Sequence, residues 1–237
     1  NFLNSVVAFL PEQRCLVHSS DSTMKLLLIG HGYLGQAISR EFLSHGWHVT
    51  TVTLSGGNES LACDVGDSQA VAQLPKADFI IHCAASGRGG AEAYQHVYVE
   101  GCRHLAETFH GTPLLFTSST SVYAQIDGSS VTEDSPAIPD RETGRLLLEA
   151  ECITLSAGGI VTRLSGIYGP SRSVLLKKFL SGQAVIEEDG SRFLNQIHRD
   201  DAARAIFHLA TLGPLPHREI FNLTDSTPLT QSICYQA

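Results

Sequence analysis

Three closely spaced glycines point most directly to a chemistry in this sequence. Gly30, Gly32 and Gly35 follow the apolar run of residues 25–29 in a G-x-G-x-x-G pattern. The first glycine permits a tight turn, the second leaves room for a pyrophosphate beside backbone N–H groups, and the third lets a helix pack closely on the strand. The N-terminus of that helix offers unpaired donors and a partial positive charge to phosphates. The pattern therefore predicts a dinucleotide-binding turn, with a glycine-rich turn that holds no ligand as the alternative.

Strands and helices must alternate along the chain to position this turn. Apolar and β-branched segments predict strands at 25–29, 47–54, 78–85, 113–117 and 159–164, and a short strand that ends near residue 63. Apolar residues at helical spacing predict helices at 35–45, 69–74, 91–109 and 145–155. Such alternation produces a parallel sheet with right-handed crossovers and helices on both faces. We therefore expect an α/β fold, a Rossmann-type doubly wound parallel sheet, with a small C-terminal substrate-side region from about residue 168.

The composition excludes several classes of protein. With 237 residues and 43% hydrophobic content, the chain can bury one substantial core. Its net charge of −8, with no basic cluster beyond Lys177 and Lys178, argues against nucleic acid as a partner. No apolar run reaches the roughly 18 residues that would span a membrane. The six cysteines show no C-x-x-C spacing, so we expect free thiols in a reducing cytoplasm and no metal site.

The two ends of the chain differ from the rest. Residues 1–23 lack periodicity, and their apolar run at 6–10 is too short for a signal-peptide core. We interpret them as an extension outside a single domain that comprises residues 24–237. The segment 229–237 predicts a helix that is cut off after about two turns, with Leu229 and Ile233 on a face that covers the sheet.

Several further segments follow the glycine motif in a fixed order. They are Asp64 and residues 82–85, 117–123, 163–170, 197–201 and 221–223. Together with the glycines, they resemble the extended short-chain dehydrogenase/reductase superfamily, the NAD(P)-dependent sugar-nucleotide epimerases and dehydratases, and especially its atypical branch. The resemblance runs from residue 25 to the C-terminus and implies NADP or NAD as the cofactor and a small molecule as the substrate.

The resemblance also implies roles for single residues. Those around the cofactor are Gly30, Gly32, Tyr33, Leu34, Gly35, Thr53, Ser55, Asp64, Ala84, Ala85 and Arg145. The glycines would hold the pyrophosphate, Asp64 would meet the adenine, and the two alanines would lie against the ribose and nicotinamide. Ser119 falls where the family keeps the hydroxyl that bonds the reacting oxygen, with a strand-end serine bonded to local backbone as the alternative. Tyr123 is a second catalytic candidate, although the Val-Tyr pair it matches mostly shapes the wall of the site.

The chain departs from this family at the proton-transfer residues. In the family, a Tyr-x-x-x-Lys pair does this chemistry: the lysine lowers the pKa of the tyrosine, which moves the proton. Alignment on Glu149 places Arg141 at the tyrosine position and Arg145 at the lysine position. Arg145 can keep a charge near the ribose hydroxyls. Arg141 cannot act as an acid near neutral pH, because a guanidinium does not release its proton.

The form of the cofactor and the function stay open at this point. Thr53 and Ser55 offer hydroxyls where a carboxylate would favour NAD and an arginine NADP; the atypical relatives favour NADP slightly. One interpretation is an oxidoreductase or epimerase that acts on a carbonyl or sugar-like hydroxyl by hydride transfer. Ser119 would orient the oxygen, and water, a substrate group or Tyr123 would replace the missing tyrosine. The alternatives are an inactive dinucleotide-binding or redox-sensing module and a broken fragment of an enzyme.

Overall fold

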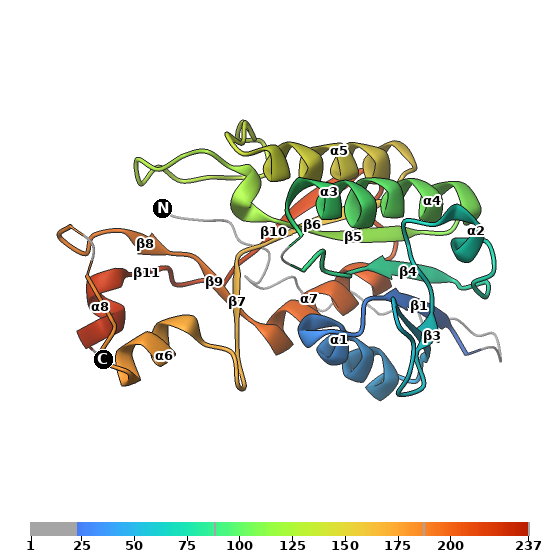
Figure 1. Cartoon of the computed structure of the whole chain (residues 1–237), viewed down its shortest axis with the longest axis horizontal. Coiled ribbons are helices and arrows are strands. Elements are labelled where there is room, and N and C mark those ends of the chain that lie inside the picture. The colour runs from blue at the N-terminus through green and yellow to red at the C-terminus, as the bar shows by residue number, and fades with distance from the viewer. Residues whose placement is uncertain (1–22, 88, 187, 237) are drawn as a thin grey trace.

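A parallel sheet forms the centre of the protein (Figure 1), in a computed structural model that describes residues 23–236 except 88 and 187. Its seven strands pair in the order β10-β6-β5-β4-β1-β2-β3, and every pair is parallel. The strands are β1 (Lys25–Ile29), β2 (His48–Thr53), β3 (Leu61–Ala62), β4 (Phe79–His82), β5 (Leu114–Ser119), β6 (Ile160–Leu164) and β10 (Glu219–Leu223). The strand order reverses between β4 and β1, where sheets of this kind bind ligands beyond the carboxyl ends of the strands. The doubly wound sheet is confirmed, whereas most of the predicted N-terminal extension lies outside the described residues.

Helices cover both faces of the sheet. On one face lie α1 (Tyr33–Ser44) and α7 (Arg199–Thr211); on the other lie α3 (Gly90–Tyr94), α4 (Gly101–Thr108) and α5 (Glu142–Ser156), with the short α2 (Ser68–Val71) beside α4 (Figure 1). Alternate residues of β1 enter different cores: Leu28 packs toward α1 and α7, and Leu27 toward the other helices. Burial on both faces explains why the strands read as nearly continuous apolar runs. Among the described residues, no helix has the length and apolar character to cross a membrane.

The helical segment that was predicted as one helix contains a widened turn. The chain stays helical from Gly90 to Thr108, but Gln95–Glu100 forms the π-helix η1 between α3 and α4. A π-helical turn carries more residues than an α-helical turn and is frequent at functional sites. The widened turn contacts α5 and leads into the part of α4 that packs on β5. It therefore lies in the helical layer over the central strands.

The C-terminal region forms a small group of elements at one end of the sheet (Figure 1). They are β7 (Gly166–Tyr168), α6 (Val174–Leu180), β8 (Phe193–Leu194), β9 (Gln196–His198), β11 (Leu229–Thr230) and α8 (Gln231–Gln236). Two expectations for the last segment are wrong. The helix begins at Gln231, because Leu229 and Thr230 pair with β8 instead, and this pairing carries α8 away from the central sheet. Ile233 is 50% exposed, and the α8 ring of Tyr235 stacks on Phe179 of α6.

Candidate active site

The glycine turn is shaped for close approach at two positions and left open at the third. A Cβ atom on Gly30, which has φ +101°, would lie 2.5 Å from the backbone of Ala84, and one on Gly35 would lie 2.0 Å from the carbonyl oxygen of Gly30. At Gly32, by contrast, an added Cβ would meet no atom within 4 Å. The open space adjoins the first turn of α1, whose N–H groups have no partner within the helix. These residues fit the pyrophosphate of a dinucleotide, because donors, space and helix dipole coincide.

The two residues between Gly32 and Gly35 face different ways. Leu34 is buried in the core between α1 and α7. The Tyr33 hydroxyl donates to the carbonyl oxygen of Pro170 at 3.1 Å, and the guanidinium carbons of Arg172 and Arg199 lie 5.1 and 4.8 Å from its ring centroid. Tyr33 therefore joins the glycine turn to the loop that follows β7.

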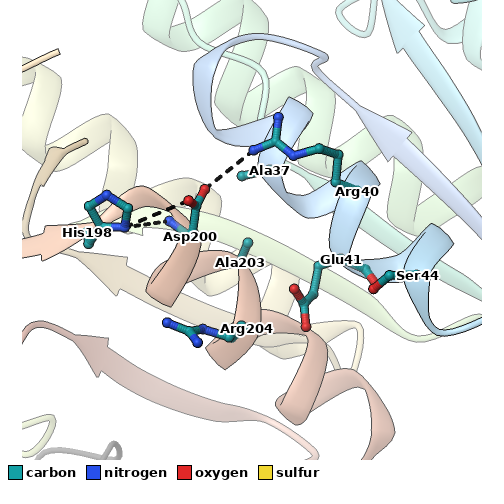
Figure 2. A pocket seen from close by; sticks show the side chains of 8 residues that line it. All are labelled: Ala37, Arg40, Glu41, Ser44, His198, Asp200, Ala203 and Arg204. Carbon is teal, nitrogen blue, oxygen red and sulfur yellow. Dashed lines mark hydrogen bonds and ion pairs between the residues drawn. The ribbon is translucent and has the colours of Figure 1, made fainter. Parts of the chain in front are cut away.

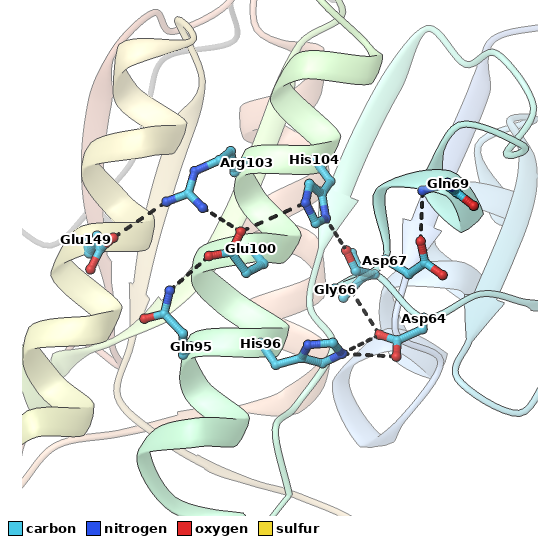
Figure 3. Close-up of polar contacts among 11 residues, drawn as sticks. Asp64, Gly66, Asp67, Gln69, Gln95, His96, Glu100, Arg103, His104 and Glu149 are labelled. Carbon is cyan, nitrogen blue, oxygen red and sulfur yellow. Dashed lines mark hydrogen bonds and ion pairs between the residues drawn. The ribbon is translucent and has the colours of Figure 1, made fainter.

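At the other end of the expected cofactor site, Asp64 is held by an imidazole (Figure 3). Its carboxylate oxygens accept hydrogen bonds from His96 Nε2 at 2.8 and 3.0 Å, and one of them also accepts from the Gly66 N–H at 3.0 Å. Partial burial acts to raise the pKa of Asp64, but these hydrogen bonds outweigh it and hold that pKa below its usual value. Nearby, the Thr53 hydroxyl donates to the carbonyl oxygen of Gly56 at 3.3 Å, and Ser55 is exposed. Sequence reasoning missed His96, which comes from η1 and carries no motif.

Ser119 ends β5 at the same edge of the sheet, one strand from the switch point. Its Oγ accepts a hydrogen bond from the Ser121 N–H at 3.1 Å and so caps the short 3₁₀ helix η2 (Thr120–Val122). The structure thus shows the local backbone contact that was the alternative. A serine hydroxyl can accept one hydrogen bond while it donates another, and the Ser119 hydrogen has no acceptor among the described residues. Ser119 can therefore still donate to a reacting oxygen.

Tyr123 belongs to a buried polar network rather than to an open wall. Its hydroxyl accepts from Arg163 Nη1 at 2.8 Å and donates to Asn222 Oδ1 at 2.9 Å. Arg163 also bonds Glu151 through three contacts of 2.7 to 3.2 Å, and Glu151 accepts from the Ser118 hydroxyl at 2.5 Å. Both hydrogen-bonding directions of the phenol are occupied, which argues for a packing role. Glu151 lies on the buried face of α5 with Leu147. A charged residue on an otherwise apolar helix face indicates a buried partner of opposite charge, and this was the signal in the sequence that could have revealed the pair.

The two arginines at the expected proton-transfer positions are both exposed. Arg141 is the residue that precedes α5, and its side chain makes no cap. Arg145 lies in the first turn of the helix, where Nη1 donates to the carbonyl oxygen of Asp140 at 2.9 Å. Neither supplies a group that can release a proton near neutral pH.

His82, at the end of β4, is fully buried and neutral. Nε2 lies 2.9 Å from the carbonyl oxygen of Val97 and must donate to it. Nδ1 therefore carries a lone pair, and this atom has no hydrogen-bond partner among the described residues. Burial lowers the pKa of His82 to about 4, although the contact with Val97 acts to raise it. A charged imidazole at this position would have neither solvent nor, among the described residues, an acidic side chain to stabilise it. Protonation of His82 therefore destabilises the folded state.

Because of His82, we expect the free energy of unfolding to fall as the pH is lowered from about 6.5 to about 4. Over this range His82 binds a proton in the unfolded chain but stays neutral in the native state. The free energy of unfolding therefore drops by about 2 kcal/mol by about pH 5. Urea unfolding at neutral pH and near pH 5 measures the drop, with His82→Leu as the comparison. A His82→Leu slope equal to that of the wild type would contradict the assignment.

A groove of about 450 Å³ lies between α1 and α7 (Figure 2). Its charged side chains come in opposite signs: Arg40 pairs with Asp200 at 3.4 Å, and Glu41 and Arg204 line the same groove. Mixed charges of this kind create no preference for an anion or a cation. The residues that line the groove include neither the three glycines of the turn nor Ser119.

Comparison with known proteins identifies a family and several relatives of this chain. The sequence matches the NAD dependent epimerase/dehydratase family over residues 26–224. Protein YeeZ of Escherichia coli (strain K12) is 29% identical over 205 residues, which are 77% of this chain and 71% of that protein. The sterol-4-alpha-carboxylate 3-dehydrogenase, decarboxylating, of Dictyostelium discoideum is 26% identical over 231 residues, 83% of this chain and 69% of that protein.

Solved structures of other proteins share the fold of this chain. An NAD-dependent epimerase/dehydratase from Methylobacillus flagellatus has a TM-score of 0.74 at 29% identity, over 91% of this chain and 80% of that one. The dTDP-glucose 4,6-dehydratase of Bacillus anthracis str. Ames, solved with NAD, shares the fold with a TM-score of 0.75 at 20% identity, over 90% of this chain and 79% of that one. The predicted superfamily and the predicted class of cofactor, a nicotinamide dinucleotide, are confirmed by the family match. This chain belongs to the NAD dependent epimerase/dehydratase family.

Proposed function

We propose that this protein is an NAD(P)-dependent oxidoreductase or epimerase that acts on a carbonyl or sugar-like hydroxyl of a small molecule. The observation that carries the proposal is the placement of Ser119 at the carboxyl end of β5, beside β4 and the strand-order reversal, with a free hydroxyl hydrogen. When bound, the cofactor supplies or accepts a hydride at C4 of its nicotinamide. Ser119 donates a hydrogen bond to the reacting oxygen and stabilises the charge that develops there.

The remaining residues bind the cofactor along the same edge. In this proposal the open space at Gly32 and the first turn of α1 bind the pyrophosphate, and Asp64 meets the adenine. Ala84, which adjoins Gly30, and Ala85 come shortly after β4 and lie against the ribose and nicotinamide. Thr53 and Ser55 offer hydroxyls that suit either ribose form, so we propose NADP or NAD. The five described cysteines are free thiols, which supports a reducing compartment such as the cytoplasm.

A second candidate function is a binding module that senses the redox state of its dinucleotide. The observation in its favour is that the Tyr123 hydroxyl is bonded to Arg163 and Asn222, while the family resemblance puts Arg141, which cannot donate a proton, at the position of the usual donor. Titration with NADH and NADPH, followed by a screen of carbonyl substrates, separates the two functions. Tight binding without turnover of any substrate would favour the module.

Ser119→Ala is expected to lower turnover on the order of 10²-fold or more, because one hydrogen-bond donor to the reacting oxygen is lost. Dinucleotide affinity should stay within about twofold, since the hydroxyl acts on the substrate. Ser121→Ala removes a neighbouring exposed hydroxyl and should change neither value, and Arg141→Ala should change turnover little. Steady-state kinetics on a substrate from the screen gives the answer. A Ser119→Ala protein with wild-type turnover would overturn the role of this residue.

A further inference from the structure

The widened turn η1 places Tyr98 over β4 and β5, two strands beside the candidate active site. The Tyr98 ring centroid lies 6.3 Å from that of His82 on β4 and 5.8 Å from that of Phe116 on β5. His82 and Phe116 are direct partners in the parallel pairing of these strands. Ser119 follows Phe116 by three residues at the end of β5. Tyr98 therefore packs on β4 and β5, the two neighbouring strands whose carboxyl ends adjoin the candidate site.

The hydroxyl of Tyr98 points at the loop expected to hold the nicotinamide side of the cofactor. It accepts a hydrogen bond from the Ser86 N–H at 3.1 Å, and Ser86 directly follows Ala84 and Ala85. The hydroxyl hydrogen has no acceptor among the described residues. This arrangement is the reverse of that at Tyr123, whose hydrogen is already donated to Asn222.

The surroundings of Tyr98 suit a group that gives up and recovers a proton. The Ser86 N–H fixes the direction of the Tyr98 hydroxyl by its hydrogen bond to the phenol oxygen. The ring is held by the edge of Tyr94, with centroids 4.9 Å apart, and by His82 and Phe116 below it. A phenol whose direction is already fixed loses little conformational entropy when it takes up the geometry for proton transfer.

We propose that Tyr98 transfers the proton in this protein, in place of the tyrosine that the family resemblance puts at position 141; the inference rests on the proposed function. In the reducing direction, the carbonyl carbon takes the hydride and the carbonyl oxygen takes the proton of the Tyr98 hydroxyl, giving an alcohol. The phenolate then takes a proton from water, and the bound reduced cofactor would be the source of the hydride. In the oxidising direction the phenolate accepts the proton of the alcohol. Ser119 donates to the same oxygen in both.

The test places a fluorine probe on the ring and does not require a substrate. The chain has six tyrosines, so protein labelled with 3-fluorotyrosine gives a small set of fluorine NMR signals, and Tyr98→Phe identifies the signal of Tyr98 by its loss. Calorimetry first measures NAD⁺ and NADP⁺ affinity of the wild-type protein. The fluorine spectrum is then recorded with and without the oxidised cofactor that binds. Tyr98→Phe removes one hydroxyl and keeps the ring, and its melting temperature checks the fold.

We expect the Tyr98 signal to move on cofactor binding, while the signals of Tyr168 and Tyr235 in the C-terminal region stay in place. With a carbonyl substrate from the screen, Tyr98→Phe should lose about 10²- to 10⁴-fold in turnover with unchanged cofactor affinity, whereas Tyr94→Phe should lose little. A Tyr98 signal that stays in place at saturating cofactor overturns the inference and leaves the proposed function intact. Absence of cofactor binding to the wild type overturns the proposed function itself.

Discussion

Replacement of Gly32 with valine is expected to abolish nicotinamide dinucleotide binding and leave the fold intact. A Cβ at this position meets no atom within 4 Å, and the backbone φ of −81° is open to any residue. The fold therefore tolerates the side chain. Its methyl groups fill the space through which the pyrophosphate reaches the first N–H groups of α1, so affinity should fall at least about 100-fold, or about 3 kcal/mol.

Calorimetric titration with NADH and NADPH measures this loss, and thermal unfolding checks the fold. Gln36→Val is a matched control, because it adds the same side chain at an exposed position one turn further along α1. Gly35→Ala makes the opposite comparison: its Cβ would lie 2.0 Å from the carbonyl oxygen of Gly30, so it should lower stability as well as binding. Unchanged affinity in Gly32→Val would remove the pyrophosphate from this turn.

The second large effect is expected on stability, at the buried ion pair between β6 and α5. Arg163 and Glu151 are 4% and 2% exposed, and their side chains meet at 2.7 Å. Arg163→Met leaves the carboxylate buried with only the Ser118 hydroxyl beside it. An uncompensated buried charge of this kind costs about 3–5 kcal/mol in free energy of unfolding.

Urea unfolding of Arg163→Met tests the size of this cost. Arg103→Met is the matched control, because it breaks the more exposed pair with Glu100 (Figure 3), which should contribute about 1 kcal/mol or less. The double change Arg163→Met with Glu151→Leu should recover a large part of the loss, since it removes both charges together. Equal destabilisation by Arg163→Met and Arg103→Met would show that the buried pair contributes no more than a surface pair.

The central sheet and the glycine turn could be predicted from the sequence because both depend on local patterns. Strands buried on both faces require continuous apolar runs, and the 25–29 run and the glycines after it lie within eleven consecutive residues. Such signals need no knowledge of distant parts of the chain. The candidate role of Ser119, by contrast, came from the family resemblance, which puts a hydroxyl at this position in the segment 117–123.

Only the tertiary structure decided which distant groups meet at this site. The pairs Asp64 with His96 and Glu151 with Arg163 join residues on different elements, and no local pattern selects one partner from several residues of the same type. The terminal segment reads as a helix, yet its first two residues pair with β8, since a strand partner far along the chain outweighs local preference. The direction of Tyr98 depends on the π-helical turn η1, which carries it. The apolar spacing in the sequence is nearly the same for an α-helical and a π-helical turn, so it does not distinguish them. Packing against the sheet and α5 decides between the two.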